Sequence, residues 1–125
     1  MRKTYPKSAR LLRRAEFQRV YGQRRSVRHA QVVLFHAPSS LGPAAPARFG
    51  FTVSRKVSKR AVHRSRIRRV WQEAVRLQRA RFRSGVDIVV NARQVDPWLL
   101  RTPEAEIILL QLAAEAGLLE PRAEQ

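Results

Sequence analysis

Cysteine is absent from this chain of 125 residues, so neither a disulfide nor a thiolate can take part in its folding or its chemistry. The absence is consistent with a reducing compartment, and we expect a cytoplasmic protein. Long hydrophobic runs are also missing. No stretch reaches the roughly 18 apolar residues that a membrane span requires, and no apolar signal-peptide core follows the basic N-terminus. We therefore expect no membrane partner.

Acidic residues are scarce. The chain has 26 Lys and Arg against nine Asp and Glu, which gives a formal net charge of +17. Residues 1–95 contain 24 of the basic residues and only three of the acidic ones, so we expect binding there and a covering role for the acidic C-terminal segment. Arginine supplies 22 of the cations, and its planar guanidinium suits bidentate contacts with phosphate and stacking on bases. The composition therefore predicts a nucleic-acid-binding protein.

Hydrophobic periodicity predicts six elements in the order α-β-β-α-β-α. Apolar residues three and four apart indicate helices over 11–21, 60–81 and 103–116, and β-branched and aromatic runs indicate strands over 31–37, 48–54 and 86–92. A loop rich in Pro, Gly and Ser joins the first two strands, which we expect to be antiparallel. Gly22 and Gly117 are expected to end the first and last helices.

These elements predict a small two-layer α/β sandwich with a mixed sheet. At this length, with 44% hydrophobic residues, the chain is expected to form a single RNA-binding domain over 1–125. Within it we expect a flexible basic arm at 1–10 and a frayed tail at 120–125.

Catalysis by the chain's own side chains is not indicated. The titratable candidates are His29, His36, His63, Glu16, Glu73, Asp87 and Asp96. No two histidines stand at ligand spacing on one helix, no carboxylates cluster, and no Gly-rich phosphate loop is present. Asp87 opens a strand, where we expect it to face water. We therefore predict no catalytic residue and no metal held by the protein alone.

The most informative stretch is VSRKVSKRAVHRSRIRRVWQEAVR, residues 53–76. Arg60, Arg64 and Arg68 stand four apart and form one stripe along the predicted helix. Residues flanking the stripe are Arg66, Arg69 and Arg76. A helix that merely faces solvent usually carries acids between its cations at i, i+4 spacing, and here almost none are present. The stretch therefore predicts a helix that binds backbone phosphates.

This stretch resembles the signature of the protein subunit of bacterial ribonuclease P, in which lysines close a strand and an arginine-asparagine-arginine motif with a following basic pair lies on the next helix. The resemblance covers roughly residues 11–116, because AEFQRVY, QVVLFHA, RFGFTVS and VDIVVNAR are similar to successive blocks of that family. It implies an accessory subunit of an RNA-based endoribonuclease that removes the 5′ leader of precursor tRNA. The partner RNA with its bound Mg²⁺ would be the catalyst, no obligate protein partner would be needed, and the strand-helix-strand crossover would be left-handed.

The resemblance also implies two sets of site residues. Those expected to contact the catalytic RNA are Arg55, Lys56, Arg60, Arg64, Ser65, Arg66, Arg68 and Arg69. A cleft between the first helix and the sheet, lined by Phe17, Tyr21 and Phe35, would take the 5′ leader, and the alternative is that these three rings are simply core. Cations expected around that cleft are Arg13, Arg14, Arg19, Arg24 and Arg25.

Two residues depart from the family pattern. Ser65 stands where asparagine is usual, and Gln72 stands where arginine is common. Serine is shorter, so the contact made by that asparagine does not carry over.

Two other classes of function compete with this one. A small basic structural RNA binder of ribosomal type would share the charge and size but would need no cleft for a single strand. A protein that cleaves RNA by itself would need an acid-base pair, which the sequence does not indicate. Whether precursor tRNA is cleaved only with a large partner RNA present separates the three.

Overall fold

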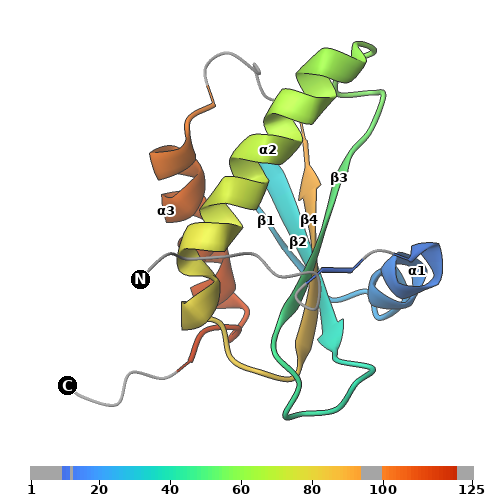
Figure 1. The fold of residues 1–125 in the computed structure, drawn as a ribbon, viewed down its shortest axis with the longest axis vertical. Helices are drawn as coiled ribbons and strands as arrows, with labels where there is room; N and C mark the ends of the chain where they lie inside the picture. Colours follow the sequence, from blue (N-terminus) through green and yellow to red (C-terminus); the bar gives the residue numbers. More distant parts are fainter. Residues whose placement is uncertain (1–9, 12, 94–99, 121–125) are drawn as a thin grey trace.

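The computed structural model describes residues 10–11, 13–93 and 100–120 (Figure 1). Its elements are α1 (Arg14–Gly22), β1 (Ser26–Arg28), β2 (Val32–Pro38), β3 (Arg48–Val53), α2 (Ala61–Gln78), the 3-10 turn η2 (Arg79–Arg81), β4 (Val86–Ala92) and α3 (Thr102–Glu115). The predicted α/β class and the order of its six elements are confirmed, and β1 is an additional short strand. Asp96, most of the predicted basic arm and most of the predicted tail lie outside the described residues.

The four strands form one mixed sheet in the order β1-β2-β4-β3. β4 pairs antiparallel with β2 and parallel with β3. β2 and β3 therefore run in opposite directions, as expected, but they are not neighbours because β4 lies between them. In Figure 1, α2 lies in front of the sheet, and β4 lies to the left of β3 with both strands running upward. The β3-α2-β4 crossover is therefore left-handed, against the usual rule for parallel strands.

The loop between β2 and β3 is held at the start of β4. Gly85 donates from its backbone N–H to the Ala45 carbonyl at 2.7 Å, and its own carbonyl accepts from the Ser39 N–H at 2.9 Å. Gly85 has φ +81°, and a Cβ there would approach the Pro43 carbonyl oxygen to 2.8 Å. Glycine is required at this position for both reasons. The loop therefore lies against the N-terminal end of β4.

Helices cover both faces of the sheet. α2 and α3 pack on one face, where the main core contains Trp71, Phe49, Ile67, Ile88 and Leu109. α1 covers part of the opposite face with a smaller core. β2 and β4 are the inner strands, so they are apolar on both sides, which explains why their sequences are continuous hydrophobic runs.

A glycine in the left-handed conformation follows α3 but not α1. Gly117 has φ +70°, and the N–H groups of Gly117 and Leu118 bond the carbonyls of Ala114 and Ala113 at 3.2 and 2.9 Å, which is a Schellman motif. α1 ends at Gly22, as predicted, but Gly22 is its last helical residue, and it is Arg24 that takes the left-handed conformation, at φ 56°. Among the described residues, no helix has both the length and the apolar character to cross a membrane.

Candidate nucleic-acid interface

α2 presents a cationic surface on the side that faces away from its buried apolar residues. Ile67, Trp71, Ala74 and Val75 are buried on the side that faces the sheet and α3. The arginines between them therefore face outward. Arg69 is exposed, and three others are half-buried: Arg64, Arg66 and Arg68. Their aliphatic stems pack on the protein while the guanidinium groups can reach outward.

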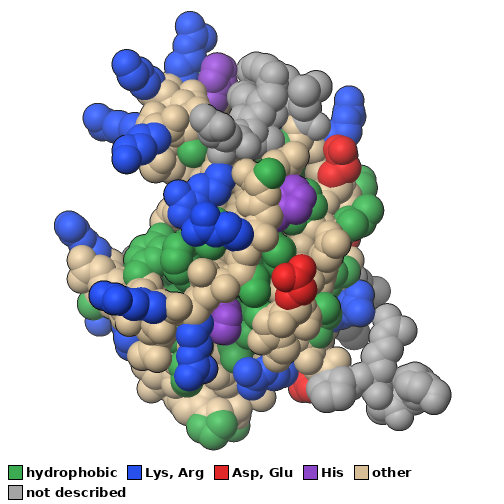
Figure 2. Space-filling model, turned by 180° about the vertical axis from the view of Figure 1, so that it is seen from behind, with side chains coloured by type: hydrophobic (Ala, Val, Ile, Leu, Met, Phe, Trp, Pro, Cys, Tyr) green, Lys and Arg blue, Asp and Glu red, His purple; other side chains and the backbone are tan. Residues whose placement is uncertain are grey.

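A cationic hollow lies at the corner where β3 leads into α2. Among the described residues it is lined by Arg55, Lys56, Lys59 and Arg64, and none of these is acidic. Arg64 donates from Nη1 to the Ser58 carbonyl at 2.8 Å, which holds the start of the helix against this turn. Lys59 was missing from the predicted set, although the run SKR in the sequence could have suggested it. Figure 2, seen from behind, shows Lys and Arg side chains gathered at this end of the molecule.

The predicted contact residues are not all equivalent. Arg55, Lys56 and Arg60 are exposed on the turn before α2. The Ser65 hydroxyl instead accepts a hydrogen bond from Arg68 Nη2 at 3.3 Å, so this serine orients an arginine one turn away. Arg76 donates to both Glu73 carboxylate oxygens, at 2.9 and 2.5 Å. Glu73 is the one acid in α2, and it pairs with Arg76 near the C-terminal end of the helix.

The three predicted aromatic residues lie together between α1 and the sheet, and each is partly exposed. The rings of Tyr21 and Phe35 meet edge to face with centroids 4.8 Å apart. The Tyr21 hydroxyl is 3.3 Å from Thr52 Oγ1, which also accepts from Asn91 Nδ2 at 2.6 Å. Phe17, Tyr21 and Phe35 are therefore neither fully buried, as the core alternative requires, nor fully exposed.

Phe17 depends on the residue beneath it. A Cβ at position 50 would come within 2.4 Å of the Phe17 ring, so the ring lies directly on Gly50 of β3. Only a glycine allows that approach. We name the partly exposed rings of Phe17, Tyr21 and Phe35 the aromatic surface.

Asp87 corrects the sequence analysis, which expected it to face water. It is completely buried, and both of its carboxylate oxygens accept from Arg48, at 3.0 Å from Nε and 2.8 Å from Nη2. Arg19 Nη2 bonds the same carboxylate. Glu16 accepts from Arg48 at 3.1 Å and from Arg19 at 3.3 Å. The network connects α1 to β3 and β4. Arg19, which was expected among the cations around the cleft, is instead paired with Glu16 and Asp87.

The network also stabilises the charged forms of Arg48 and Glu16. The hydrogen bond to Asp87 raises the pKa of the Arg48 guanidinium above its ordinary value. Partial burial alone would raise the pKa of Glu16, but hydrogen bonds from Ser40 and Arg19 and the charges of Arg19 and Arg48 hold it below its ordinary value. A carboxylate that is stabilised as an anion is a poor proton donor. The arrangement is therefore suited to fixing α1 on the sheet.

The histidines contribute little to the electrostatics of the interface. Burial, together with the charges of Arg25 and Arg83, lowers the pKa of His36 from its ordinary value. His63 Nδ1 lies 3.3 Å from the Ser58 hydroxyl, in the turn before α2. Within residues 10–11, 13–93 and 100–120, no group of three His, Asp or Glu side chains could hold a metal ion.

The comparisons with known proteins agree with this geometry. A family model described as Ribonuclease P matches residues 5–98. A relative in Symbiobacterium thermophilum, described as "Ribonuclease P protein component", is 41% identical over 114 residues, which are 91% of this chain and 96% of that protein. A solved structure of the Staphylococcus aureus RNase P protein has TM-score 0.75 at 27% identity and covers 91% of this chain and 100% of that one.

A second solved structure from Staphylococcus aureus is described as an RNase P protein mutant with defective mRNA degradation activity. It has TM-score 0.76 at 27% identity and covers 90% of this chain and 92% of that one. These relatives favour the ribonuclease P prediction over the ribosomal-type alternative. This small α/β chain, with an arginine-bearing helix on one side of its sheet and aromatic rings on the other, belongs to the ribonuclease P protein family.

Proposed function

We propose that the chain acts as the RNA-binding subunit of ribonuclease P and leaves the chemistry to its partner RNA. The observation that carries this proposal is the presence of two different RNA-binding chemistries on opposite faces of one sheet. α2 offers phosphate-binding cations, and the aromatic surface offers rings for unpaired bases.

The catalytic RNA is the partner of the α2 side. The cationic hollow and the exposed Arg60 and Arg69 form a surface several residues long, suited to tracking a folded RNA backbone. Arg66 and Arg68 extend it along the helix. Ser65 contributes indirectly, by orienting Arg68.

The 5′ leader of precursor tRNA is the partner of the aromatic surface. An unpaired strand can stack its bases on rings that are accessible on one side, and such stacking tolerates any sequence. Exposed cations near α1 are available for the leader's phosphates: Arg13, Arg14, Arg24 and Arg25. A structural RNA binder of ribosomal type would have no use for this second surface.

The proposed division of labour assigns Mg²⁺ to the RNA. The two carboxylates that the fold brings together, Glu16 and Asp87, are both engaged by arginines. We propose that the chain works in the cytoplasm, alongside precursor tRNA, and needs no obligate protein partner.

The test is cleavage of precursor tRNA by purified protein, by its cognate ribonuclease P RNA, and by both together at limiting Mg²⁺. We expect cleavage at the mature 5′ end when both are present and none with RNA-free protein. The reaction with RNA-free protein is essential because the Staphylococcus aureus mutant is described as defective in mRNA degradation activity. If RNA-free protein cleaved at that position, and Glu16→Gln or His63→Gln abolished the cleavage, catalysis would belong to the protein and the proposal would be wrong.

A further inference from the structure

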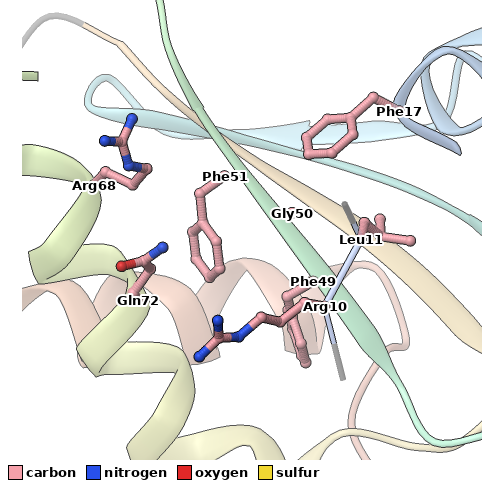
Figure 3. A pocket seen from close by; sticks show the side chains of 8 residues that line it. All are labelled: Arg10, Leu11, Phe17, Phe49, Gly50, Phe51, Arg68 and Gln72. Carbon is pink, nitrogen blue, oxygen red and sulfur yellow. The ribbon is translucent and has the colours of Figure 1, made fainter. Parts of the chain in front are cut away.

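A pocket of about 170 Å³ opens at the outer edge of β3, between α1 and α2 (Figure 3). Its lining combines Arg10, Leu11, Phe17, Phe49, Gly50, Phe51, Arg68 and Gln72. It lies apart from the cationic hollow at the β3-α2 corner, with which it shares no lining residue. It adjoins the aromatic surface only through Phe17.

The backbone of β3 and the chain beside it build this pocket. Leu11 donates from its N–H to the Phe49 carbonyl at 2.8 Å, so residues 10 and 11 run next to the first half of β3. Gly50 leaves the space that the Phe17 ring enters. In Figure 3 the Phe51 ring extends from β3 toward Gln72 of α2, and the Arg10 guanidinium points the same way from the other side.

The lining has the chemistry of a nucleotide site. Phe49 is buried, whereas Phe51 is only partly buried. Two arginines and a carboxamide surround that ring, and none of the eight lining residues is acidic. A carboxamide both donates and accepts hydrogen bonds, as the edges of nucleobases do.

We infer that this pocket takes the base of one unpaired ribonucleotide. The base lies against Phe51, Gln72 bonds its edge, and Arg10 and Arg68 bind the adjoining phosphates. The volume is below the roughly 300 to 1,000 Å³ of pockets that enclose a whole drug-sized ligand, so the ribose and phosphate stay at the mouth. This inference rests on the proposed function, and it adds a base-binding site to helix α2, which otherwise offers contacts to phosphates.

The nucleotide has two possible sources. Arg68 belongs to the surface proposed for the catalytic RNA, and Phe17 belongs to the surface proposed for the leader. The pocket lies between them, so a bulged nucleotide of the catalytic RNA or a nucleotide of the leader could reach it. The chemistry of recognition is the same in both cases.

Site-specific crosslinking distinguishes the sources. The chain has no cysteine, so Gln72→Cys provides a unique attachment point for a short photocrosslinker. The matched control is Gln111→Cys, on an exposed position of α3. In the holoenzyme bound to precursor tRNA, we expect Gln72→Cys to mark one or two adjacent unpaired nucleotides, in the catalytic RNA or in the leader. Crosslinks no stronger than those of the control, or spread over paired regions, would refute the site.

Affinity gives the second measurement. Phe51→Leu keeps an apolar side chain but removes the ring, and we expect it to weaken binding of the crosslinked RNA about fivefold to a hundredfold. Gln72→Ala should weaken it about two- to tenfold, and Gln111→Ala should have no effect. Thermal melting must first show that each variant folds. If wild-type protein assembles an active holoenzyme while both pocket variants bind equally well, the pocket inference fails and the proposed function stands. If wild-type protein fails to bind the RNA at all, the proposed function itself is wrong.

Discussion

At the scale of single residues, the aromatic surface depends on side chains that are only half available. Tyr21 and Phe35 pack against each other edge to face and are partly buried, so only the exposed part of each ring is available to an RNA base. An alanine at either position removes a stacking partner worth about 1 to 3 kcal/mol per base.

We therefore predict that Tyr21→Ala and Phe35→Ala weaken holoenzyme binding of precursor tRNA about fivefold to a hundredfold. Mature tRNA, which has no leader, should bind almost unchanged. Binding of both tRNAs should be titrated after circular dichroism has shown that the variants fold. Equal losses for the two tRNAs would mean that these rings serve only the fold.

Gly50 is the second decisive residue, because the Phe17 ring occupies the place of its side chain. We predict that Gly50→Ala costs about 1 to 3 kcal/mol of unfolding free energy, as overpacking does, and weakens leader binding by displacing Phe17. The control is Gly22→Ala, because Gly22 lies in helix α1 and a Cβ at this position would meet no atom within 4 Å. That change should be neutral or stabilise the protein by up to about 1 kcal/mol. Urea unfolding of both variants measures the difference, and equal stabilities would contradict the packing argument.

At the scale of elements, we expect the cations of α2 to act together on the phosphates of the RNA. With about four to eight phosphates neutralised, log K for the catalytic RNA should fall against log salt with a slope on the order of −3 to −7. We predict that Arg64→Ala and Arg68→Ala each make the slope shallower by roughly one. Arg101→Ala, an exposed arginine just before α3, is the control and should leave the slope unchanged. An unaltered slope in the folded double variant would remove α2 from the interface.

The attachment of α1 to the sheet is the second property of an element. Asp87 is buried between Arg19 and Arg48, and removing one partner of a buried ion pair leaves the others without compensation. We predict that Asp87→Ala lowers the free energy of unfolding by about 3 to 5 kcal/mol. Glu73→Ala breaks the exposed pair with Arg76 and should have a small effect by comparison. Denaturant titrations compare the two variants, and similar losses would show that the buried network does not fix α1.

At the scale of the whole molecule, the charges make stability depend on pH. The pKa of His36 is lowered in the folded protein, so the unfolded chain binds a proton first as the pH falls below about 6.5. Glu16 and Glu73 also have lowered pKa values, Glu73 mainly through its hydrogen bonds with Arg76. Their stabilising contribution is present above the unfolded pKa near 4.5 and is lost as the pH falls through the lower folded values.

We therefore predict that the melting temperature falls in two stages on acidification. The first stage begins near pH 6.5, and His36→Asn should flatten it because asparagine takes up no proton. The second begins near pH 4.5 and should persist in that variant. Thermal melts from pH 8 to pH 3 test this. A first stage that is identical in His36→Asn would assign it to other groups.

Features of this protein that depend on neighbouring residues could be predicted from its amino-acid sequence. Helix periodicity placed α2 and put Arg64 and Arg68 on one of its faces, because residues four apart lie on one face of any α-helix. Arg60, predicted to belong to the same helical stripe, is instead the N-cap in an extended conformation, and α2 begins at Ala61. Apolar runs placed β2, β3 and β4, and Gly117 marked the end of α3. β1 was not predicted, because three residues are too few to show the alternation of apolar and polar side chains that marks a strand. It is a strand because it pairs with β2.

The contacts between segments that are distant in the sequence could be read only from the tertiary structure. Asp87 reaches Arg19 across 68 positions of the chain and Arg48 across 39, and no local pattern records such a pairing. The same is true of β4, which inserts between β2 and β3, and of the pocket that Phe51 and Gln72 share across the β3-α2 crossover. Local periodicity reports which side of an element is apolar, whereas the partner of that side is selected by packing of the whole chain. For this reason the sequence predicted the cations of the interface, and the fold shows which of their side chains are exposed and which, like Arg19, are held in ion pairs.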